Sequence, residues 1–171
     1  TCISGHLEIA KYLIELSEKK GEKINIHAQN EYAFRFACIN SHFDICNYLI
    51  ELGKKEGEKI NIHAKDEDAF RSTCINGNID AVKYLIELGE RKGETKIDIH
   101  IHNELAFRWV CGNGQFKIVK YLIELGERKD ETKIDIHAQG EDAFCCACKS
   151  GHFKIVKYLI ELGERKDETK I

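Results

Sequence analysis

A seven-residue block, Lys-Tyr-Leu-Ile-Glu-Leu-Gly or a near copy of it, occurs five times in this chain of 171 residues. The tyrosines of the five copies follow one another at intervals of 36, 36, 37 and 37 residues: Tyr12, Tyr48, Tyr84, Tyr121 and Tyr158. Self-similarity at such a period is typical of solenoids, in which each repeat contacts only its neighbours. We therefore predict a single array over residues 1–171, with the repeats 1–24 (partial), 25–60, 61–97, 98–134 and 135–171.

Each repeat is expected to contain a turn and two short helices. An Ile-His-Ala sequence and short polar residues predict an extended segment and a tight turn. Phe34, Ala37 and Cys38 then mark one face of a first helix at i, i+3 and i+4. A second helix is expected over about residues 43–52, followed by solvated charged loops such as residues 127–133. Four glycines stand where a left-handed helix-ending residue is expected: Gly53, Gly89, Gly126 and Gly163.

The second-helix segments carry a resemblance to a known family. Residues 5–15, Gly-His-Leu-Glu-Ile-Ala-Lys-Tyr-Leu-Ile-Glu, and residues 150–161, Ser-Gly-His-Phe-Lys-Ile-Val-Lys-Tyr-Leu-Ile-Glu, are similar to the second-helix motif of ankyrin repeats. The resemblance covers the whole chain and implies an all-α ankyrin-repeat solenoid of paired short helices with short hairpin or loop connections. It also implies a protein-binding scaffold without catalysis, whose hairpin tips and first helices form a concave face.

The sequence departs from the family where the first helix begins. The family's Thr-Pro-Leu-His is replaced by sequences such as Leu-Ala-Phe-Arg at residues 105–108. The Ile-His-Ala and Ala-Phe-Arg variants resemble the ankyrin proteins of giant DNA viruses that infect amoebae. For a viral protein, the expected location is the host-cell cytoplasm.

Composition limits the classes of partner. Lys and Arg number 26 against 29 Asp and Glu, a net charge of -3, which lacks the basic excess typical of phosphate binding. Nucleic acid is therefore disfavoured. No apolar run approaches the roughly 18 residues of a membrane span and no signal segment is evident, so we expect a soluble, intracellular, cytoplasmic protein. Because residues 1–3 match residues 73–75 in mid-repeat, and the first residue is not Met, we expect both ends to be cut inside a longer array.

Five of the eight cysteines share one repeat position on the first helix: Cys2, Cys38, Cys74, Cys111 and Cys148. Stacked helices lie about 8–10 Å apart, beyond the roughly 7 Å limit for disulfides, so these cysteines are expected to be small core residues. Cys145, Cys146 and Cys148 cluster in the last repeat but lack the further ligands that zinc requires. We expect no metal and no cofactor.

Histidines recur at the opening of four repeats: His27, His63, His100 and His137. We interpret each ring as hydrogen-bonded to hairpin or adjacent-loop backbone, with a pH sensor as the alternative. His42 and His152 are expected to have the same structural role. No catalytic motif is present, and acids such as Glu67 and Asp68 are expected to be solvated in turns, so we predict no enzyme.

One first-helix position carries arginine in three repeats and Cys145 in the fourth: Arg35, Arg71 and Arg108. One interpretation is a structural hydrogen bond or ion pair to a neighbouring hairpin acid such as Asp66 or Asp142. The alternative is a basic stripe that binds an acidic peptide. Two nearby positions vary between repeats: Tyr32, Asp68, Leu105 and Asp142 at one, and Phe36, Ser72, Trp109 and Cys146 at the other.

Variation of this kind indicates a surface that discriminates between partners, because the second helices are nearly identical. Trp and Arg are also the residues most enriched at binding hot spots. We therefore predict a protein-binding face centred on Trp109. Its other residues are Tyr32, Arg35, Phe36, Arg71, Leu105 and Arg108. The alternatives are a helical-repeat nucleic-acid reader and a purely structural, self-assembling array.

Overall fold

The computed structural model of the chain describes residues 2–91, 93–128 and 132–165, apart from the side chain of Arg165. These residues form nine α-helices and no strand. The helices are α1 Leu7–Lys19, α2 Ala28–Ile39, α3 Phe43–Glu56, α4 Ala64–Ile75, α5 Ile79–Gly89, α6 Ile101–Gly112, α7 Phe116–Gly126, α8 Ala138–Lys149 and α9 Phe153–Arg165.

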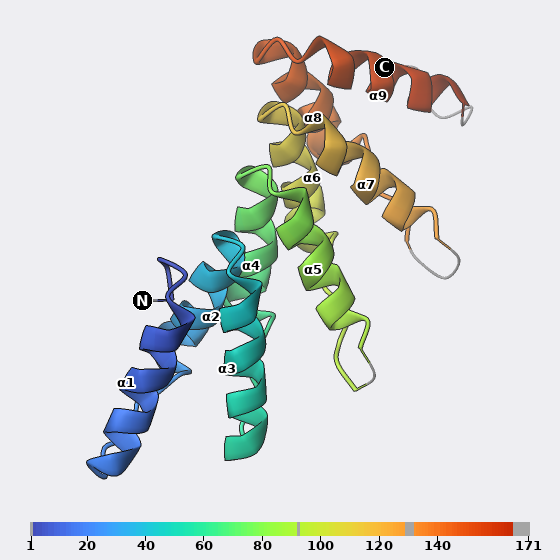
Figure 1. Cartoon of the computed structure of the whole chain (residues 1–171). Helices are drawn as coiled ribbons and strands as arrows, with labels where there is room; N and C mark the ends of the chain where they lie inside the picture. Colours follow the sequence, from blue (N-terminus) through green and yellow to red (C-terminus); the bar gives the residue numbers. More distant parts are fainter. Residues whose placement is uncertain (1, 92, 129–131, 166–171) are drawn as a thin grey trace. The chain divides into compact units, whose positions relative to one another are not determined.

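Figure 1 shows the helices in chain order, and the chain divides into two compact units whose boundary falls within α4. The first contains Thr1–Thr73 and Asp80–Ile97, and the second contains Cys74–Ile79 and Asp98–Ile171. In the first unit, α3 packs against α1 and α2, and in the second, α6 packs against α7 and α8 while α9 packs against α7 and α8. First and second helices of one repeat thus pair, and like helices of successive repeats stack. The predicted all-α repeat solenoid is confirmed, whereas the grouping of all five repeats into one array stays a prediction.

The second helices bury one face, as their periodicity predicts. In α7, Ile118 and Leu122 are fully buried while Lys117 and Glu124 are exposed. The first helices contribute small residues and one large aromatic ring to the same core. Phe34, Phe70 and Phe107, at one position in three repeats, are each 0 % exposed. At about 25 cal/mol per Å² of apolar surface, these rings are among the largest contributors to the stability of each repeat.

The turn between the two helices of a repeat is left-handed at Ser41 (φ 63°) and Gly77 (φ 74°), as the small residues there predict. His42 follows the first of these turns, and its Nε2 donates a hydrogen bond of 2.9 Å to the carbonyl oxygen of Ile3. His152 donates in the same way to Gly112 at 3.0 Å. The predicted structural role of these two histidines is confirmed.

The glycines after the second helices have a different role from the one predicted. Gly53 lies inside α3, which continues to Glu56, and the left-handed residue is Gly57 (φ 80°). A Cβ atom on Gly53 would lie only 2.6 Å from the carbonyl oxygen of Glu58. The absence of a side chain therefore lets the returning chain pack against the helix. Gly89 and Gly126 are the last residues of α5 and α7, and Gly163 lies within α9, none of them with positive φ.

The charged run at residues 127–133 is described only in part. Residues 129–131 lie outside the described residues, and those on either side, 127–128 and 132–133, are exposed. This exposure agrees with the predicted solvated loop for the described part of the run.

Candidate partner-binding face

The tight turn that opens each repeat is a left-handed helical turn. Gln29, Asn30 and Glu31 have φ values of 55°, 55° and 60°, and the right-handed part of α2 begins after them. The same conformation recurs at residues 65–67, 102–104 and 139–141. Only one of these twelve residues is glycine, and the left-handed conformation costs other residues roughly 1–2 kcal/mol each. Interactions elsewhere in the repeat must offset this cost.

A histidine–glutamate pair spans the left-handed turn in every full repeat. The Nδ1–H group donates to Oε1 of the glutamate four residues later, in the pairs His27–Glu31 (2.8 Å), His63–Glu67 (2.7 Å), His100–Glu104 (2.6 Å) and His137–Glu141 (2.6 Å). The histidine partner is thus a carboxylate, and the predicted backbone partner is wrong. Glu67, which we expected to be solvated, is only 4 % exposed. The turn itself carries this glutamate into the interior.

The same carboxylates connect successive repeats within each compact unit. Oε1 of Glu31 also accepts a hydrogen bond of 3.2 Å from the backbone N–H of Asn61. Oε1 of Glu104 accepts one of 3.2 Å from Asp135 in the same way. Each of these glutamates therefore holds its own turn and the start of the next repeat.

The arginine four residues after the glutamate bonds to the carbonyl groups of the turn. In the second compact unit, Nε of Arg108 donates to Asn103 at 3.0 Å and Nη2 donates to His102 at 3.3 Å. Nε and Nη2 of Arg35 and Arg71 donate to the equivalent carbonyl oxygens. The guanidinium group thereby provides donors for carbonyl groups that the left-handed turn directs toward it.

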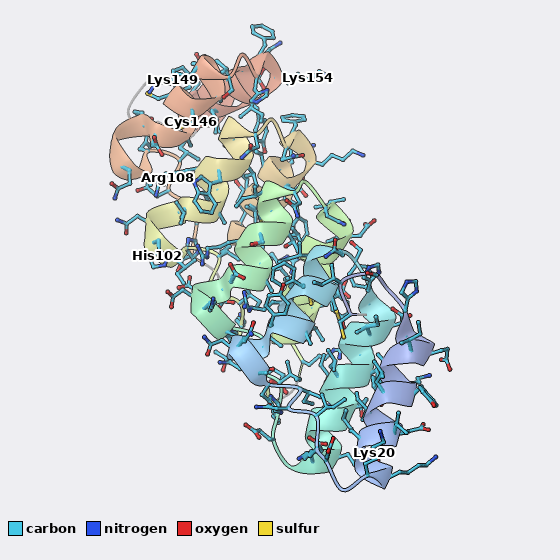
Figure 2. All side chains as sticks on the ribbon, turned by 90° about the vertical axis from the view of Figure 1, so that its left-hand side faces the viewer. Lys20, His102, Arg108, Cys146, Lys149 and Lys154 are labelled. Carbon is cyan, nitrogen blue, oxygen red and sulfur yellow. The ribbon has the colours of Figure 1, made fainter. Side chains whose placement is uncertain are left out.

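The remaining nitrogen of two of these arginines binds an acid of the next repeat. Nη1 of Arg108 donates to Oδ2 of Asp142 at 2.7 Å, and the thiol of Cys146 donates to the other oxygen at 3.5 Å. Figure 2 labels Arg108 and Cys146 in this part of the chain. Nη1 of Arg35 forms the equivalent ion pair with Asp68, and only 4 % of Arg35 is exposed. The structural interpretation of the arginines therefore holds at two positions.

The aromatic residue at the variable position of α6 is not part of the core. Trp109 is 37 % exposed, and its indole N–H has no hydrogen-bond partner among the described residues. Leu105, one turn earlier, is half-buried. A large ring with an unused donor is the kind of anchor that protein interfaces favour.

Two further predicted contact residues stack in the first compact unit. The rings of Tyr32 and Phe36 have centroids 4.3 Å apart, and Cζ of Arg35 lies 6.0 Å from each centroid. Tyr32 is 37 % exposed and Phe36 is partly exposed. The structure thus brings together three of the seven predicted residues. Each compact unit therefore exposes aromatic side chains next to a left-handed turn that an arginine holds by hydrogen bonds.

Comparison with protein families decides the class of this repeat. A model described as "Ankyrin repeats (3 copies)" matches residues 70–170, and one described as "Ankyrin repeats (many copies)" matches residues 2–50. The chain is an ankyrin-repeat protein. Ankyrin repeats generally mediate protein binding. A search of curated proteins found no match to the chain.

Of the five cysteines that share one position in these ankyrin repeats, the three in the middle of the chain are buried. Cys38, Cys74 and Cys111 are 0 % exposed, as predicted, and burial raises the pKa of all three thiols. Sγ of Cys38 lies 3.3 Å from Sγ of Cys46, a thiol contact between α2 and α3. Cys148 is exposed and Cys2 is half-buried, so the predicted core position is wrong at Cys148 and only partly met at Cys2.

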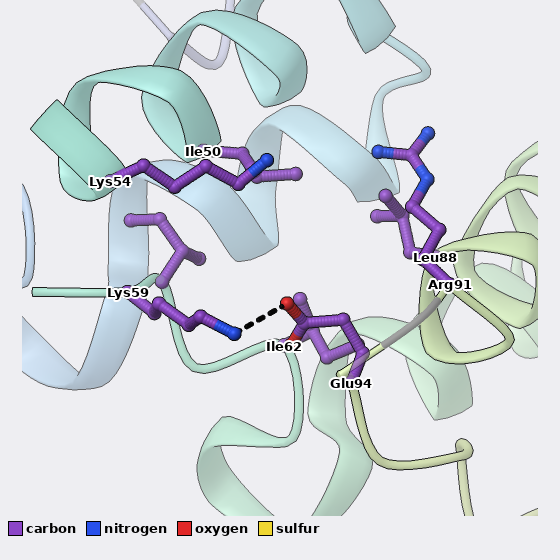
Figure 3. Close-up of a pocket in the computed structure, with 8 residues that line it drawn as sticks. Ile50, Lys54, Lys59, Ile62, Leu88, Arg91 and Glu94 are labelled. Carbon is purple, nitrogen blue, oxygen red and sulfur yellow. Dashed lines mark hydrogen bonds and ion pairs between the residues drawn. The ribbon is translucent and has the colours of Figure 1, made fainter.

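The first compact unit has an open hollow of about 310 Å³ between α1 and α3 and, elsewhere, a much smaller cavity. The smaller cavity lies between the ends of α3 and α5 and the following loop, with a volume of about 30 Å³ (Figure 3). Lys59 and Glu94 close one side through an ion pair of 3.0 Å. The volume of this smaller cavity admits one or two water molecules and is too small for a metabolite.

The described residues contain no cluster of three or more His, Cys, Asp or Glu side chains able to hold a metal ion. Among the same residues, every helix is too short or too polar to cross a membrane.

Sequence reasoning missed the glutamates that hold the opening turns of these ankyrin repeats. Glu31, Glu67, Glu104 and Glu141 recur in every full repeat, four residues after a histidine and four before the arginine position. That invariant spacing was the available signal. A glutamate in a polar turn is ordinarily solvated, and only the left-handed turn directs Glu31, Glu67 and Glu104 into the interior, whereas Glu141 is partly exposed.

Proposed function

We propose that this ankyrin array is a non-catalytic scaffold or adaptor whose protein partner binds the surface formed by the opening turns and first helices. The observation that carries the proposal is the exposed Trp109, with an unused indole N–H, at a position that also holds Phe36 and Ser72 in other repeats. Buried aromatic anchors dominate the energy of protein interfaces. Variation at such a position allows one array to discriminate between partners.

The surroundings of these positions support the proposal because they are held in place before any partner arrives. His100, Glu104 and Arg108 form hydrogen bonds with their own turn, and Glu104 also bonds to the next repeat. A surface that loses little conformational freedom on association retains more of its contact energy as affinity. The rigid turn therefore favours a binding role for the exposed side chains next to it.

The arginines favour protein over nucleic acid as the partner. Nε and Nη2 of Arg35, Arg71 and Arg108 donate to backbone carbonyl groups, and two of the three also pair with aspartates. Few of these donors remain for phosphates, and the net charge of -3 opposes a polyanion. We further propose an intracellular setting, the host-cell cytoplasm if the resemblance to giant-virus ankyrin proteins reflects its origin.

The single tryptophan provides a direct test of the surface. Peptides would be selected from a random display library without tryptophan against the intact chain, then titrated while the emission of Trp109 is followed. Binding over the ring should shift its emission to shorter wavelength, because the indole leaves water. The control is the variant Lys117→Ala, on the exposed face of α7, with which the same shift is expected. Peptides that bind without changing the emission of Trp109 would contradict the proposal.

A further inference from the structure

The three arginines of the turns form unequal sets of bonds. All three donate from Nε and Nη2 to their own turn, and Nη1 of Arg35 and Arg108 donates to an aspartate of the next repeat. Nη1 of Arg71 has no partner among the described residues. Asp142 follows Arg108 by 34 residues, and the residue at the same interval after Arg71 is Leu105.

The charge of Arg71 is also incompletely compensated. Oδ1 of Asp68 lies 4.0 Å from Nη2 of Arg71, but Oδ2 of the same carboxylate is bound by Arg35. One carboxylate thus serves two guanidinium groups. Lys65 and Asp66, on the same turn, carry exposed charges of opposite sign. Arg71 therefore retains both a free donor and positive charge.

We propose that the partner protein supplies an aspartate or glutamate carboxylate to Nη1 of Arg71, an inference that rests on the proposed function. The chain itself shows which ligand this nitrogen takes, since a carboxylate occupies it at Arg35 and at Arg108. Arg71 is already fixed by hydrogen bonds of 2.7 Å and 3.0 Å, and 17 % of its side chain is exposed. A carboxylate therefore meets a donor that loses little side-chain freedom on binding.

A phosphate group would suit the same donor chemically, because guanidinium groups bind both kinds of anion. The neighbouring acids decide between them. Asp66 and Asp68 lie on the same turn, and a chain of phosphates would be repelled by them as well as by the net charge of -3. A single carboxylate on an otherwise uncharged segment meets much less repulsion.

The test is a double-mutant cycle between the chain and the peptides selected on it. Each selected peptide, made with an amidated C-terminus, would be compared with versions in which one Asp or Glu becomes Asn or Gln. Affinities would be measured for the intact chain, for Arg71→Gln and for Lys117→Gln, which removes the same charge from the exposed face of α7. Hydrogen bonds to charged groups predict that one amide change weakens binding to the intact chain about tenfold to a hundredfold. The same change should have little effect in Arg71→Gln and its full effect in Lys117→Gln.

The outcomes separate the two proposals. Peptides that shift the emission of Trp109 but show no coupling between an acid and Arg71 would overturn this inference and leave the proposed function standing. A library that yields no binding peptide would overturn both. Binding of mixed single-stranded DNA that depends on Arg71 would also overturn the inference in favour of phosphate.

Because Arg71→Gln removes bonds to its own turn, Arg71→Lys serves as a second variant. Lysine keeps the positive charge but lacks the planar guanidinium group. If Arg71→Lys binds the peptides as tightly as the intact chain does, the result would count against the proposal.

Discussion

Arg108 and Asp142 are joined across successive repeats by a hydrogen bond of 2.7 Å from Nη1 to Oδ2. Nε and Nη2 of the same guanidinium group hold the left-handed turn of the preceding residues. One side chain therefore stabilises the turn of its own repeat and attaches it to the next. The ion pair is therefore a structural interaction between repeats, and its strength depends on pH because the Asp142 carboxylate can be protonated.

The Arg108–Asp142 pair should lose its contribution to stability in acid. The hydrogen bond from Arg108 holds the pKa of Asp142 below its usual 3.8. A lowered pKa means that the stabilisation is fully present above about pH 4 and disappears as the pH falls through the lowered value. Asp142→Asn should therefore reduce the free energy of unfolding near neutral pH, by less than about 1 kcal/mol because the pair is partly exposed.

The measurement is urea denaturation of both proteins between pH 2 and pH 7. The two unfolding free energies should converge below pH 4. Glu124→Gln, an exposed change on α7, is the control and should show little effect at any pH. A difference for Asp142→Asn that persists unchanged at pH 2 would contradict this account.

Removal of a buried turn glutamate should be far more costly. Glu104→Ala leaves Nδ1 of His100 and the backbone N–H of Asp135 without the acceptor that both now share. Unsatisfied donors cost roughly 1–3 kcal/mol each when fully buried, and these two are partly buried, so a loss of about 1–2 kcal/mol is expected. Glu104→Gln keeps one side-chain oxygen and should lose less. The control Glu124→Ala should stay within about 0.5 kcal/mol, and equal losses for Glu104→Ala and Glu124→Ala would refute the role of the turn.

The cysteines should divide into two classes of reactivity. Cys38, Cys74 and Cys111 are buried, and their raised pKa values keep the thiols protonated. A thiol reagent should therefore modify them only after denaturant is added. Cys145 and Cys148 are exposed and should react at once. Mass spectrometry of the labelled peptides checks this order, and immediate modification of all five would show that the helix packing described above is wrong.

The sequence was sufficient to predict the repeated pairs of helices and their apolar faces. Ile118 and Leu122 recur at helical spacing, and the structure buries both. Cys38, Cys74 and Cys111 were expected in the core because one repeat position places them on the inner face of the first helix. Periodic apolar patterns predict such features well because burial of the apolar face drives the packing.

The opening turn could not be predicted in the same way. Gln29, Asn30 and Glu31 have no individual preference strong enough to indicate three consecutive left-handed residues. Their conformation depends on bonds to His27, Arg35 and the next repeat, which act over distance in the sequence. Gly53 was misinterpreted for a related reason. Glycine usually indicates a left-handed helix end, whereas here the decisive factor is the close approach of Glu58.

The central claim is that a protein partner binds the surface around Trp109. The direct measurement is the affinity of the selected peptides for Trp109→Ala and Lys117→Ala, together with urea denaturation of both variants. Loss of a central aromatic anchor costs about 2 kcal/mol or more, so Trp109→Ala should weaken binding at least about thirtyfold while Lys117→Ala leaves it nearly unchanged. Since Trp109 is 37 % exposed, its removal should cost much less stability than a core truncation. A folded Trp109→Ala variant that binds as tightly as the original chain would contradict the account.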